Sequence, residues 1–150
     1  MARSGRTARD ASVAQRRSTQ RLYLDASPLV KLVVPEAESG ALRTFLRAWP
    51  RRFSSAVATV EVTRAAHRYS SAPALARRVE QVMARVVLVD VTPEILVRAA
   101  HLHPATLRAL DAIHLASALS LGRDLGGLVT YDDQLAQAAR AAGVTLFAPR

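Results

Sequence analysis

Short apolar runs alternate along this chain with longer segments in which apolar residues recur at helical spacing. The first run, at residues 22–24, stops at Asp25 and is followed by Ser27-Pro28, a pair typical of a helix start. Further strands are predicted at residues 53–57, 86–89, 127–130 and 144–147, with helices between them. This alternation indicates an α/β fold whose sheet is mainly parallel and carries helices on both faces.

Local signals place the ends of the helices. Thr59 is predicted to cap a helix that runs to about residue 69, and either Asp132 or Asp133 opens the last helix. The other helices are predicted at residues 27–34, 36–49, from 73 onward, 93–102 and 107–121. The run at residues 86–89 is apolar at every position, which is typical of a strand buried on both faces.

The composition indicates one soluble globular domain. The chain has 150 residues, 50% of them hydrophobic, and no apolar run approaches the roughly 20 residues of a membrane-spanning helix. There is no cysteine, which excludes disulfides and thiolate metal sites. A chain without cysteine suits a reducing compartment, and we expect a cytoplasmic protein.

Positive charge is in surplus, with a net charge of +9 supplied almost entirely by arginine. Residues 1–20 are rich in Arg, Ser, Thr and Ala and lack both apolar periodicity and the apolar block of a secretory signal. We therefore expect a disordered basic tail at residues 1–20 and a domain at residues 21–150. The surplus of positive charge favours a polyanionic partner or an acidic protein. The tail could be an arm that binds nucleic acid. A general arginine bias in the composition explains the surplus equally well.

Acidic residues occupy four positions that are unusual for charges facing solvent. Asp25 ends the first strand, Glu61 lies one turn into the helix after the second, Asp111 stands in a largely apolar helix, and Asp132 follows the fourth strand. Because strand ends and the helix starts beyond them share one edge of a parallel sheet, these carboxylates can meet in one cleft. Taken singly, Asp25 and Asp132 are explained as helix caps and Glu61 as a first-turn acid, whereas Asp111 is costly to leave unpaired.

Carboxylates gathered in one cleft need a compensating cation or protons. Two of them about 4 Å apart repel by about 4 kcal/mol at an effective dielectric constant of roughly 20. Oxygen ligands, without cysteine or paired histidine, point to Mg²⁺ or Mn²⁺ and away from Zn²⁺. Such an ion activates water and stabilises charge on phosphate, so the sequence predicts hydrolysis of phosphodiester bonds.

The segments that hold these acids resemble the four acidic motifs of PIN-domain ribonucleases, and those of VapC toxins in particular. They read LYLDASPLVKLVVPE, SSAVATVEVTRA, LRALDAIHLASAL and GLVTYDDQLAQAARAAGV, and they follow one another in the family's order across residues 21–149. The resemblance implies a three-layer α/β/α sandwich of the PIN type and Mg²⁺- or Mn²⁺-dependent cleavage of RNA. It also implies a VapB-type antitoxin as partner, in a homodimer or a toxin–antitoxin hetero-oligomer.

By position, the resemblance also assigns the site. The metal-binding catalytic acids would be Asp25, Glu61, Asp111 and Asp132, with Ser27 and Thr130 at supporting polar positions. Asp133, directly after Asp132, leaves the fourth acid ambiguous. The basic tail before residue 21 is the main departure from the family's pattern.

Two other functions match parts of the pattern. A phosphatase with Asp25 as its nucleophile, similar to the haloacid-dehalogenase-like enzymes, wants a second aspartate where this chain has Ser27. A PIN-like module that only binds nucleic acid through its arginines gains nothing from carboxylates placed near phosphates.

Three further features each keep two interpretations. His114, three residues after Asp111, is a packed structural residue or a general base. Lys31 is solvated, or it faces the cleft and binds phosphate. Phe45, Leu46 and Trp49 belong to the core, or they line a groove that binds the antitoxin.

Overall fold

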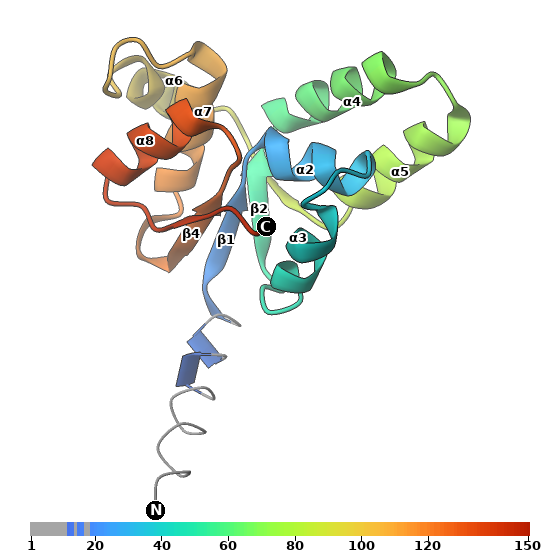
Figure 1. The fold of residues 1–150 in the computed structure, drawn as a ribbon. Helices are drawn as coiled ribbons and strands as arrows, with labels where there is room; N and C mark the ends of the chain where they lie inside the picture. The colour runs from blue at the N-terminus through green and yellow to red at the C-terminus, as the bar shows by residue number, and fades with distance from the viewer. Residues whose placement is uncertain (1–11, 14, 17–18) are drawn as a thin grey trace, which may run out of the picture.

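Five parallel strands form the centre of the protein in the computed structural model, which describes residues 12–13, 15–16 and 19–150 (Figure 1). The strands are β1 (Arg21–Leu24), β2 (Arg52–Ser55), β3 (Val87–Val89), β4 (Leu125–Val129) and β5 (Leu146–Phe147). Their order across the sheet is β3-β2-β1-β4-β5, and each neighbouring pair runs parallel. The central strand is therefore β1, whose carboxyl end leads into Asp25.

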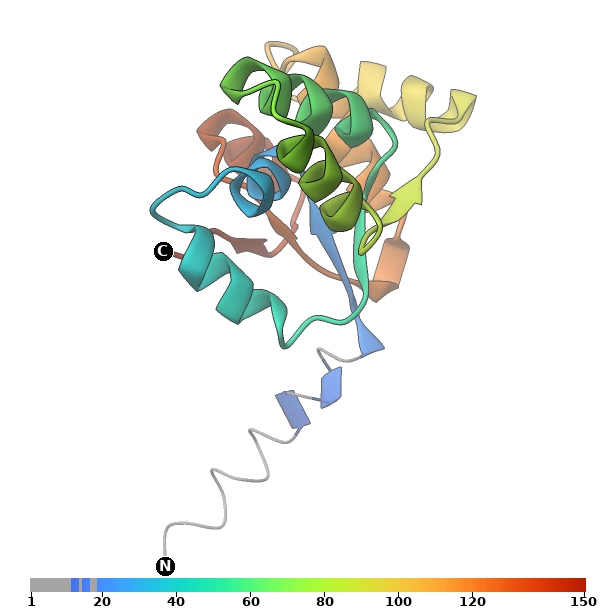
Figure 2. The ribbon, with the colours of Figure 1, turned by 90° about the vertical axis from the view of Figure 1, so that its right-hand side faces the viewer.

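Helices cover both faces of this sheet (Figures 1 and 2). One layer holds α2 (Ala26–Val33), α3 (Ser39–Leu46), α4 (Val57–Tyr69) and α5 (Pro73–Met83), and the other holds α6 (Pro93–Ala100), α7 (Ala109–Leu119) and α8 (Asp133–Ala141). A short 3-10 helix, Gly122–Asp124, joins α7 to β4. The arrangement is a three-layer α/β/α sandwich, so the predicted fold class is confirmed.

Alternation along β1 explains why the molecule has a core on each side of the sheet. Leu22 and Leu24 pack with apolar residues of α2, α3, α4 and α5, whereas Tyr23 between them packs with residues of α7 and α8. All three side chains are fully buried. Asp25 therefore follows directly after a strand that is enclosed on both faces.

The start of the helix after β2 differs from the prediction. Thr59 does not cap α4, because this helix begins at Val57 and its N-cap residue, Ala56, makes no side-chain hydrogen bond. The start of the last helix was predicted at either of two aspartates, and the structure distinguishes them. Asp132 is the N-cap of α8, and Asp133 is its first helical residue.

The prediction that residues 86–89 are buried on both faces is wrong. This run forms β3, which is an edge strand of the sheet, and Val87 and Leu88 are 56% and 39% exposed. Only Val86 and Val89 of the run contact the hydrophobic clusters. The helical layers are centred on β1 and its neighbours, so an apolar run at the margin of the sheet stays partly uncovered.

The aromatic residues near the end of α3 belong mainly to the core. Trp49 and Leu46 are buried, and the half-buried Phe45 packs against Trp49 and Phe147. This packing supports the core interpretation of the three residues over an exposed groove.

The predicted basic tail lies mostly outside the described residues, because residues 1–11, 14, 17 and 18 are not described. At its end, the carbonyl oxygen of Thr19 accepts a hydrogen bond from the Arg51 guanidinium at 2.9 Å. Among the residues that the structure does describe, there is no helix with the length and apolar character needed to cross a membrane.

Candidate active site

Asp25 lies at the carboxyl end of β1 and is the N-cap residue of α2. Its Oδ1 accepts hydrogen bonds from the backbone N–H of Ser27 at 3.1 Å and from the Ser27 hydroxyl at 2.6 Å. Its Oδ2 accepts one from the Thr130 hydroxyl at 2.8 Å. Only 4% of Asp25 is exposed, and this burial raises the pKa of the carboxyl group to about 6, although the hydrogen bonds from Ser27 and Thr130 favour the charged form.

Asp132 reaches the same edge of the sheet because β4 lies beside β1. Its backbone N–H donates to Thr130 Oγ1 at 3.0 Å, so Thr130 connects Asp132 with Asp25. Its Oδ1 accepts a hydrogen bond from the backbone N–H of Leu135 at 2.9 Å and so caps α8, while its Oδ2 contacts Arg108. Capping therefore engages one carboxylate oxygen and leaves the other for a cation.

The guanidinium of Arg108 bridges two of the predicted acids. It donates through Nε to Asp111 Oδ2 at 2.6 Å and through Nη2 to Asp132 Oδ2 at 2.5 Å, and both contacts raise the pKa of Arg108. Partial burial opposes ionisation of Asp132, but hydrogen bonds from Leu135 and Arg108 outweigh it and lower its pKa. The Arg108 side chain is 60% exposed, so water screens the bridge and leaves the side chain room to swing outward.

Glu61 is held by a buried histidine. Its Oε2 lies 2.7 Å from Nε2 of His114, and Nδ1 of His114 lies 2.9 Å from the hydroxyl oxygen of Tyr23. Burial raises the pKa of Tyr23, so the phenol keeps its proton. A carboxylate only accepts hydrogen bonds, so Nε2 of His114 is the donor to Glu61. His114 is 1% exposed, which supports its interpretation as a structural residue.

The structure thus joins the four predicted acids in two hydrogen-bonded groups. One group contains Asp25, Thr130, Asp132, Arg108 and Asp111, and the other contains Tyr23, His114 and Glu61. The groups approach each other at α7, where Asp111 and His114 are three residues apart. No three Asp, Glu or His side chains form a ready metal-binding cluster within the described part of the chain.

Sequence reasoning missed two parts of this site. Arg108 stands three residues before Asp111, and this spacing favours an ion pair on a helix. The spacing is visible in the sequence and could have revealed the pair. The contact of His114 with Glu61 has no comparable local signal, because the two residues lie 53 positions apart.

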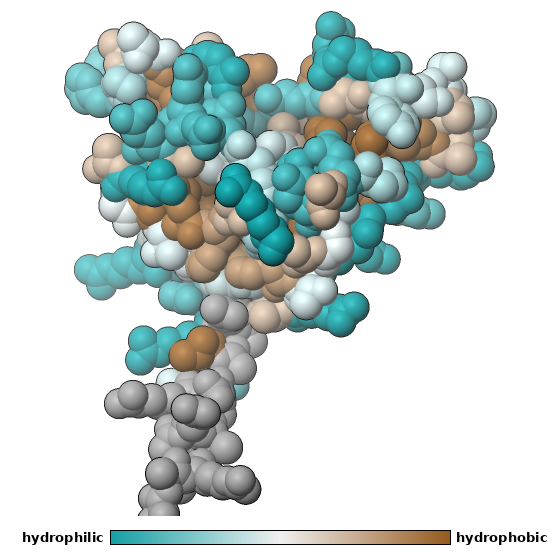
Figure 3. All heavy atoms as spheres, in the orientation of Figure 1, coloured by the Kyte–Doolittle hydropathy of each residue, from teal (hydrophilic) through white to brown (hydrophobic). Residues whose placement is uncertain are grey.

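A hollow of about 680 Å³ opens beside Glu61, between α2, α4 and the start of α7. Ser27 lines it next to Asp25, and Lys31, Arg64 and Arg68 add positive charge to its walls. The volume lies within the range of ligand pockets, roughly 300–1,000 Å³. Most of the outer surface seen in Figure 3 is hydrophilic, with hydrophobic residues in smaller patches.

Lys31 matches neither of its two interpretations fully, because it faces the hollow but is already paired with acidic residues. It lines the hollow, but its ammonium group pairs with Glu36 at 2.5 Å and with Glu38 at 2.9 Å. It also lies 4.8 Å from the centre of the Tyr131 ring, and its side chain is only 12% exposed. Lys31 is therefore a fixed, paired cation at the rim of the hollow.

Known proteins similar to this chain point to one family. Residues 22–141 match the family described as PIN domain. The chain is 47% identical to Ribonuclease VapC46 of Mycobacterium tuberculosis (strain ATCC 25618 / H37Rv), over 85% of this chain and 97% of that protein. It is 35% identical to Ribonuclease VapC47 and 40% identical to Ribonuclease VapC35, both of Mycobacterium tuberculosis (strain CDC 1551 / Oshkosh), over 85% of this chain and 96% of each relative. The chain belongs to the PIN-domain family and, within it, to the VapC ribonucleases.

Proposed function

We propose that the protein is a metal-dependent endoribonuclease and the toxin of a toxin–antitoxin pair. It would hydrolyse RNA phosphodiester bonds at a site formed by Asp25, Glu61, Asp111 and Asp132. The observation that carries the proposal is the buried carboxylate of Asp25, fixed by two hydroxyl groups at the edge of the sheet that Asp132 also reaches. An ionised acid in such a place is costly unless a cation accompanies it. The relatives are named ribonucleases, which supports RNA as the substrate.

The donor set suits Mg²⁺ or Mn²⁺. The candidate ligands are carboxylate oxygens, which these hard ions prefer. Arg108 acts as a cation between Asp111 and Asp132, which supports a site where positive charge is stabilised. Asp25, Glu61, Asp111 and Asp132 would hold the ion, which would supply activation of water and stabilisation of the charge that develops on phosphate.

The residues around the acids would prepare the site for the substrate. Ser27 and Thr130 orient Asp25, and His114 orients Glu61. Arg64 and Arg68 line the hollow beside these acids, where they would attract the phosphate groups of an RNA strand. Positioning residues of this kind reduce the reorganisation needed when the substrate binds.

We propose a VapB-type antitoxin as the protein partner, in the cytoplasm and in a homodimer or toxin–antitoxin hetero-oligomer. A segment of the antitoxin would lie across the acidic edge, the surface that carries Asp25, Glu61, Asp111 and Asp132. It would present an arginine to these carboxylates. Arg108 supports this idea, because it already shows that a guanidinium matches the space between two of these acids. A purified complex that cleaves RNA as fast as the toxin alone would rule out this mode of inhibition.

Cleavage of a structured RNA in Mg²⁺, Mn²⁺ or EDTA tests the proposed activity. We expect cleavage with either metal ion and none in EDTA. A module that only binds nucleic acid would retain RNA without cutting it in all three conditions. A phosphatase would instead release phosphate from a small phosphomonoester. Either result would replace the ribonuclease proposal.

A further inference from the structure

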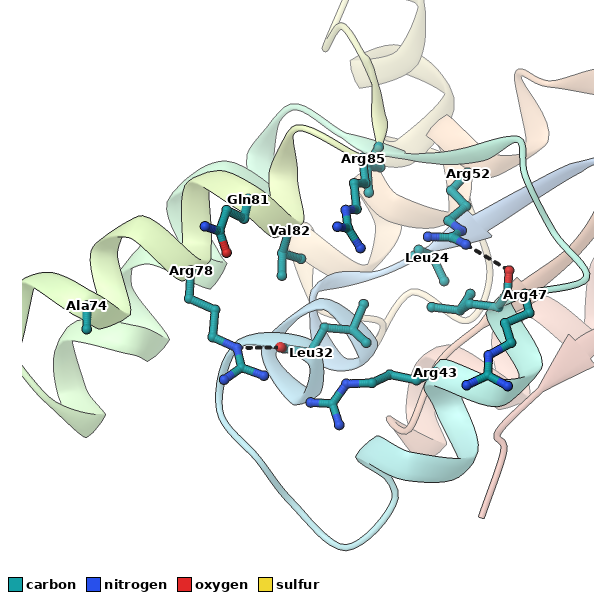
Figure 4. Close-up of a pocket in the computed structure, with 12 residues that line it drawn as sticks. Leu24, Leu32, Arg43, Arg47, Arg52, Ala74, Arg78, Gln81, Val82 and Arg85 are labelled. Atoms are coloured by element: carbon teal, nitrogen blue, oxygen red, sulfur yellow. Dashed lines mark hydrogen bonds between the residues drawn. The ribbon is translucent and has the colours of Figure 1, made fainter.

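A second hollow, of about 570 Å³, opens between α2, α3, α5 and the start of β2 (Figure 4). Its described lining contains no acidic residue and five arginines, which are Arg43, Arg47, Arg52, Arg78 and Arg85. These residues come from α3, from the start of β2 and from α5 with the turn after it. Figure 4 shows their side chains arranged around the hollow from these separate elements. The fold therefore gathers positive charge here from distant parts of the sequence.

Two of the guanidinium groups are oriented by backbone carbonyl groups. Arg52 donates from Nε to the carbonyl oxygen of Trp49 and from Nη2 to that of Leu46, both at 2.8 Å. Arg78 donates from Nε to the carbonyl oxygen of Leu32 at 3.2 Å. A carbonyl acceptor orients a guanidinium without cancelling its charge. Each guanidinium has further N–H groups for an anion, since arginine carries five in total.

The arginines of this hollow form no ion pair with a carboxylate of the described residues. The ion pairs that do form in this part of the chain use other cations. Burial, together with the charge of Arg85, lowers the pKa of the half-buried Arg52. Like charges crowded in this way favour a bound anion.

Apolar side chains separate the arginines. Leu24, Leu32, Leu46, Val82 and Val86 line the same hollow. Guanidinium groups match phosphate oxygens in pairs, and apolar surface suits a sugar or a base. The volume is again in the range of small-molecule pockets, roughly 300–1,000 Å³.

We propose that this hollow binds a phosphate-bearing ligand of nucleotide size, either a free nucleotide or the phosphorylated end of an RNA strand. None of the four acids lines it, although Leu24, the residue before Asp25, does. Arg52 and Val86 place part of it at the amino ends of β2 and β3, whereas Asp25 stands at the carboxyl end of β1. Binding here requires no cleavage of RNA, so it is tested apart from the ribonuclease proposal.

Calorimetric titration of the whole protein in EDTA, which removes divalent metal ions from the acidic site, tests the proposal. The probes are AMP, adenosine, and a short RNA with and without a 5′-phosphate. The double variant Arg43→Gln/Arg47→Gln removes two exposed guanidiniums from the hollow. Its matched control, Arg77→Gln/Arg123→Gln, removes the same charge from exposed positions outside the hollow.

We expect AMP to bind and adenosine not to bind. The affinity for AMP should fall about tenfold or more in the hollow variant and less than about twofold in the control. Preference for the 5′-phosphorylated RNA over its unphosphorylated twin would identify the strand end as a ligand. Binding of AMP without that preference would identify the free nucleotide.

Other results would overturn the proposal. Equal loss in the two double variants would mean that AMP responds to net charge only, and equal binding of adenosine would exclude phosphate recognition. Failure of AMP to bind, with saturable binding of a peptide of alternating Glu and Leu, would make the hollow a protein-docking site. The variant Asp111→Asn should bind AMP as tightly as the unchanged protein does, because Asp111 does not line the hollow. The test of AMP binding is therefore independent of the ribonuclease proposal.

Discussion

The acidic edge differs from the arginine hollow, which is the hollow lined by Arg43, Arg47, Arg52, Arg78 and Arg85, in how its crowded charge is compensated. At the edge, each acid has a partner from within the chain: hydroxyl groups for Asp25, Arg108 for both Asp111 and Asp132, and His114 for Glu61. In the hollow, Arg52 and Arg78 donate hydrogen bonds to carbonyl oxygens, and among the described residues no carboxylate forms an ion pair with its arginines. The charges of the acidic edge are therefore compensated within the protein, whereas those of the arginine hollow are left to be compensated by a ligand.

Replacing Asp111 by Asn should produce the largest change, because it removes an acid from the edge and half of the Arg108 bridge. We expect RNA cleavage to fall about a hundredfold or more. The melting temperature should stay the same or rise, since repulsion among the acids decreases. Cleavage assays in Mn²⁺ and thermal unfolding measure the two effects. A folded variant with normal cleavage would remove Asp111 from the proposed site.

Asp132 and Asp133 form the next sharpest comparison, because they are adjacent and carry the same charge. Asp132→Asn should weaken Mn²⁺ binding and slow cleavage strongly, while asparagine keeps the cap on α8. Asp133→Asn should change neither, because Asp133 is exposed in the first turn of the helix. Metal titration and cleavage on both variants measure this. If Asp133→Asn is the damaging change, the fourth acid is misassigned.

Asp25 should make the stability of the metal-free protein depend on pH. Its folded-state pKa of about 6 lies above the usual 3.8, so the stability that it contributes is full below about pH 4 and is lost as the pH rises through 6. The loss amounts to about 3 kcal/mol for a shift of this size. Asp25→Asn should therefore raise the free energy of unfolding by about 1–3 kcal/mol at about pH 8 and barely change it at about pH 4.

Urea unfolding in EDTA at the two pH values measures this difference. A benefit of Asp25→Asn that is equal at both would mean that burial of the charge is not its cause. Asparagine can still accept from Ser27 and donate to the Thr130 hydroxyl, so the hydrogen bonds themselves are a small part of the change.

Arg108→Gln should remove the positive charge that compensates Asp111 and Asp132 at the acidic edge. Without the guanidinium, Mn²⁺ no longer competes with Arg108 for Asp111 and Asp132, and its affinity should rise about two- to tenfold. Calorimetry compares this variant with Arg123→Gln, which removes the same charge at a distance from the site. A lower Mn²⁺ affinity would show that Arg108 positions the acids and does not compete with the ion.

Removal of residues 1–20 should have the smallest effect. Fold and metal-dependent cleavage should persist, because the segment has no apolar face to bury. RNA affinity should fall modestly and depend less on salt, since several arginines are lost. Circular dichroism and RNA binding at two salt concentrations measure this. A truncated protein that is unfolded or insensitive to metal would make the tail structural.

The fold was readable from the sequence where local patterns decide the structure. The apolar run ending at Asp25 and the helix start at Ser27-Pro28 are local signals, and the structure has β1 and α2 there. The order of strands is not a local property, so the edge position of β3 and the exposure of Val87 and Leu88 escaped the prediction.

The candidate site divides in the same way. Strand ends predicted where Asp25 and Asp132 would lie, and the structure places both at one edge of the sheet. The partners of the acids come from far along the chain: His114 contacts Glu61 across 53 positions, and Arg108 contacts Asp132 across 24. Such pairs depend on how helices pack across the sheet, which no local spacing specifies.

The position of β4 beside the central strand β1 determines when, during synthesis, the four acids can come together. Residues 21–89 supply β1, β2 and β3 together with α2, α3, α4 and α5, but they contain only Asp25 and Glu61 of the four acids. Asp111 and Asp132 emerge later, and so does Thr130, which completes the hydrogen bonds of Asp25. Because proteins are made from the amino terminus and their units fold as they emerge, an unfinished chain holds an incomplete site. If these four acids form the proposed ribonuclease site, the chain would stay inert until β4 has inserted beside β1, and the RNA that encodes it would be protected during synthesis.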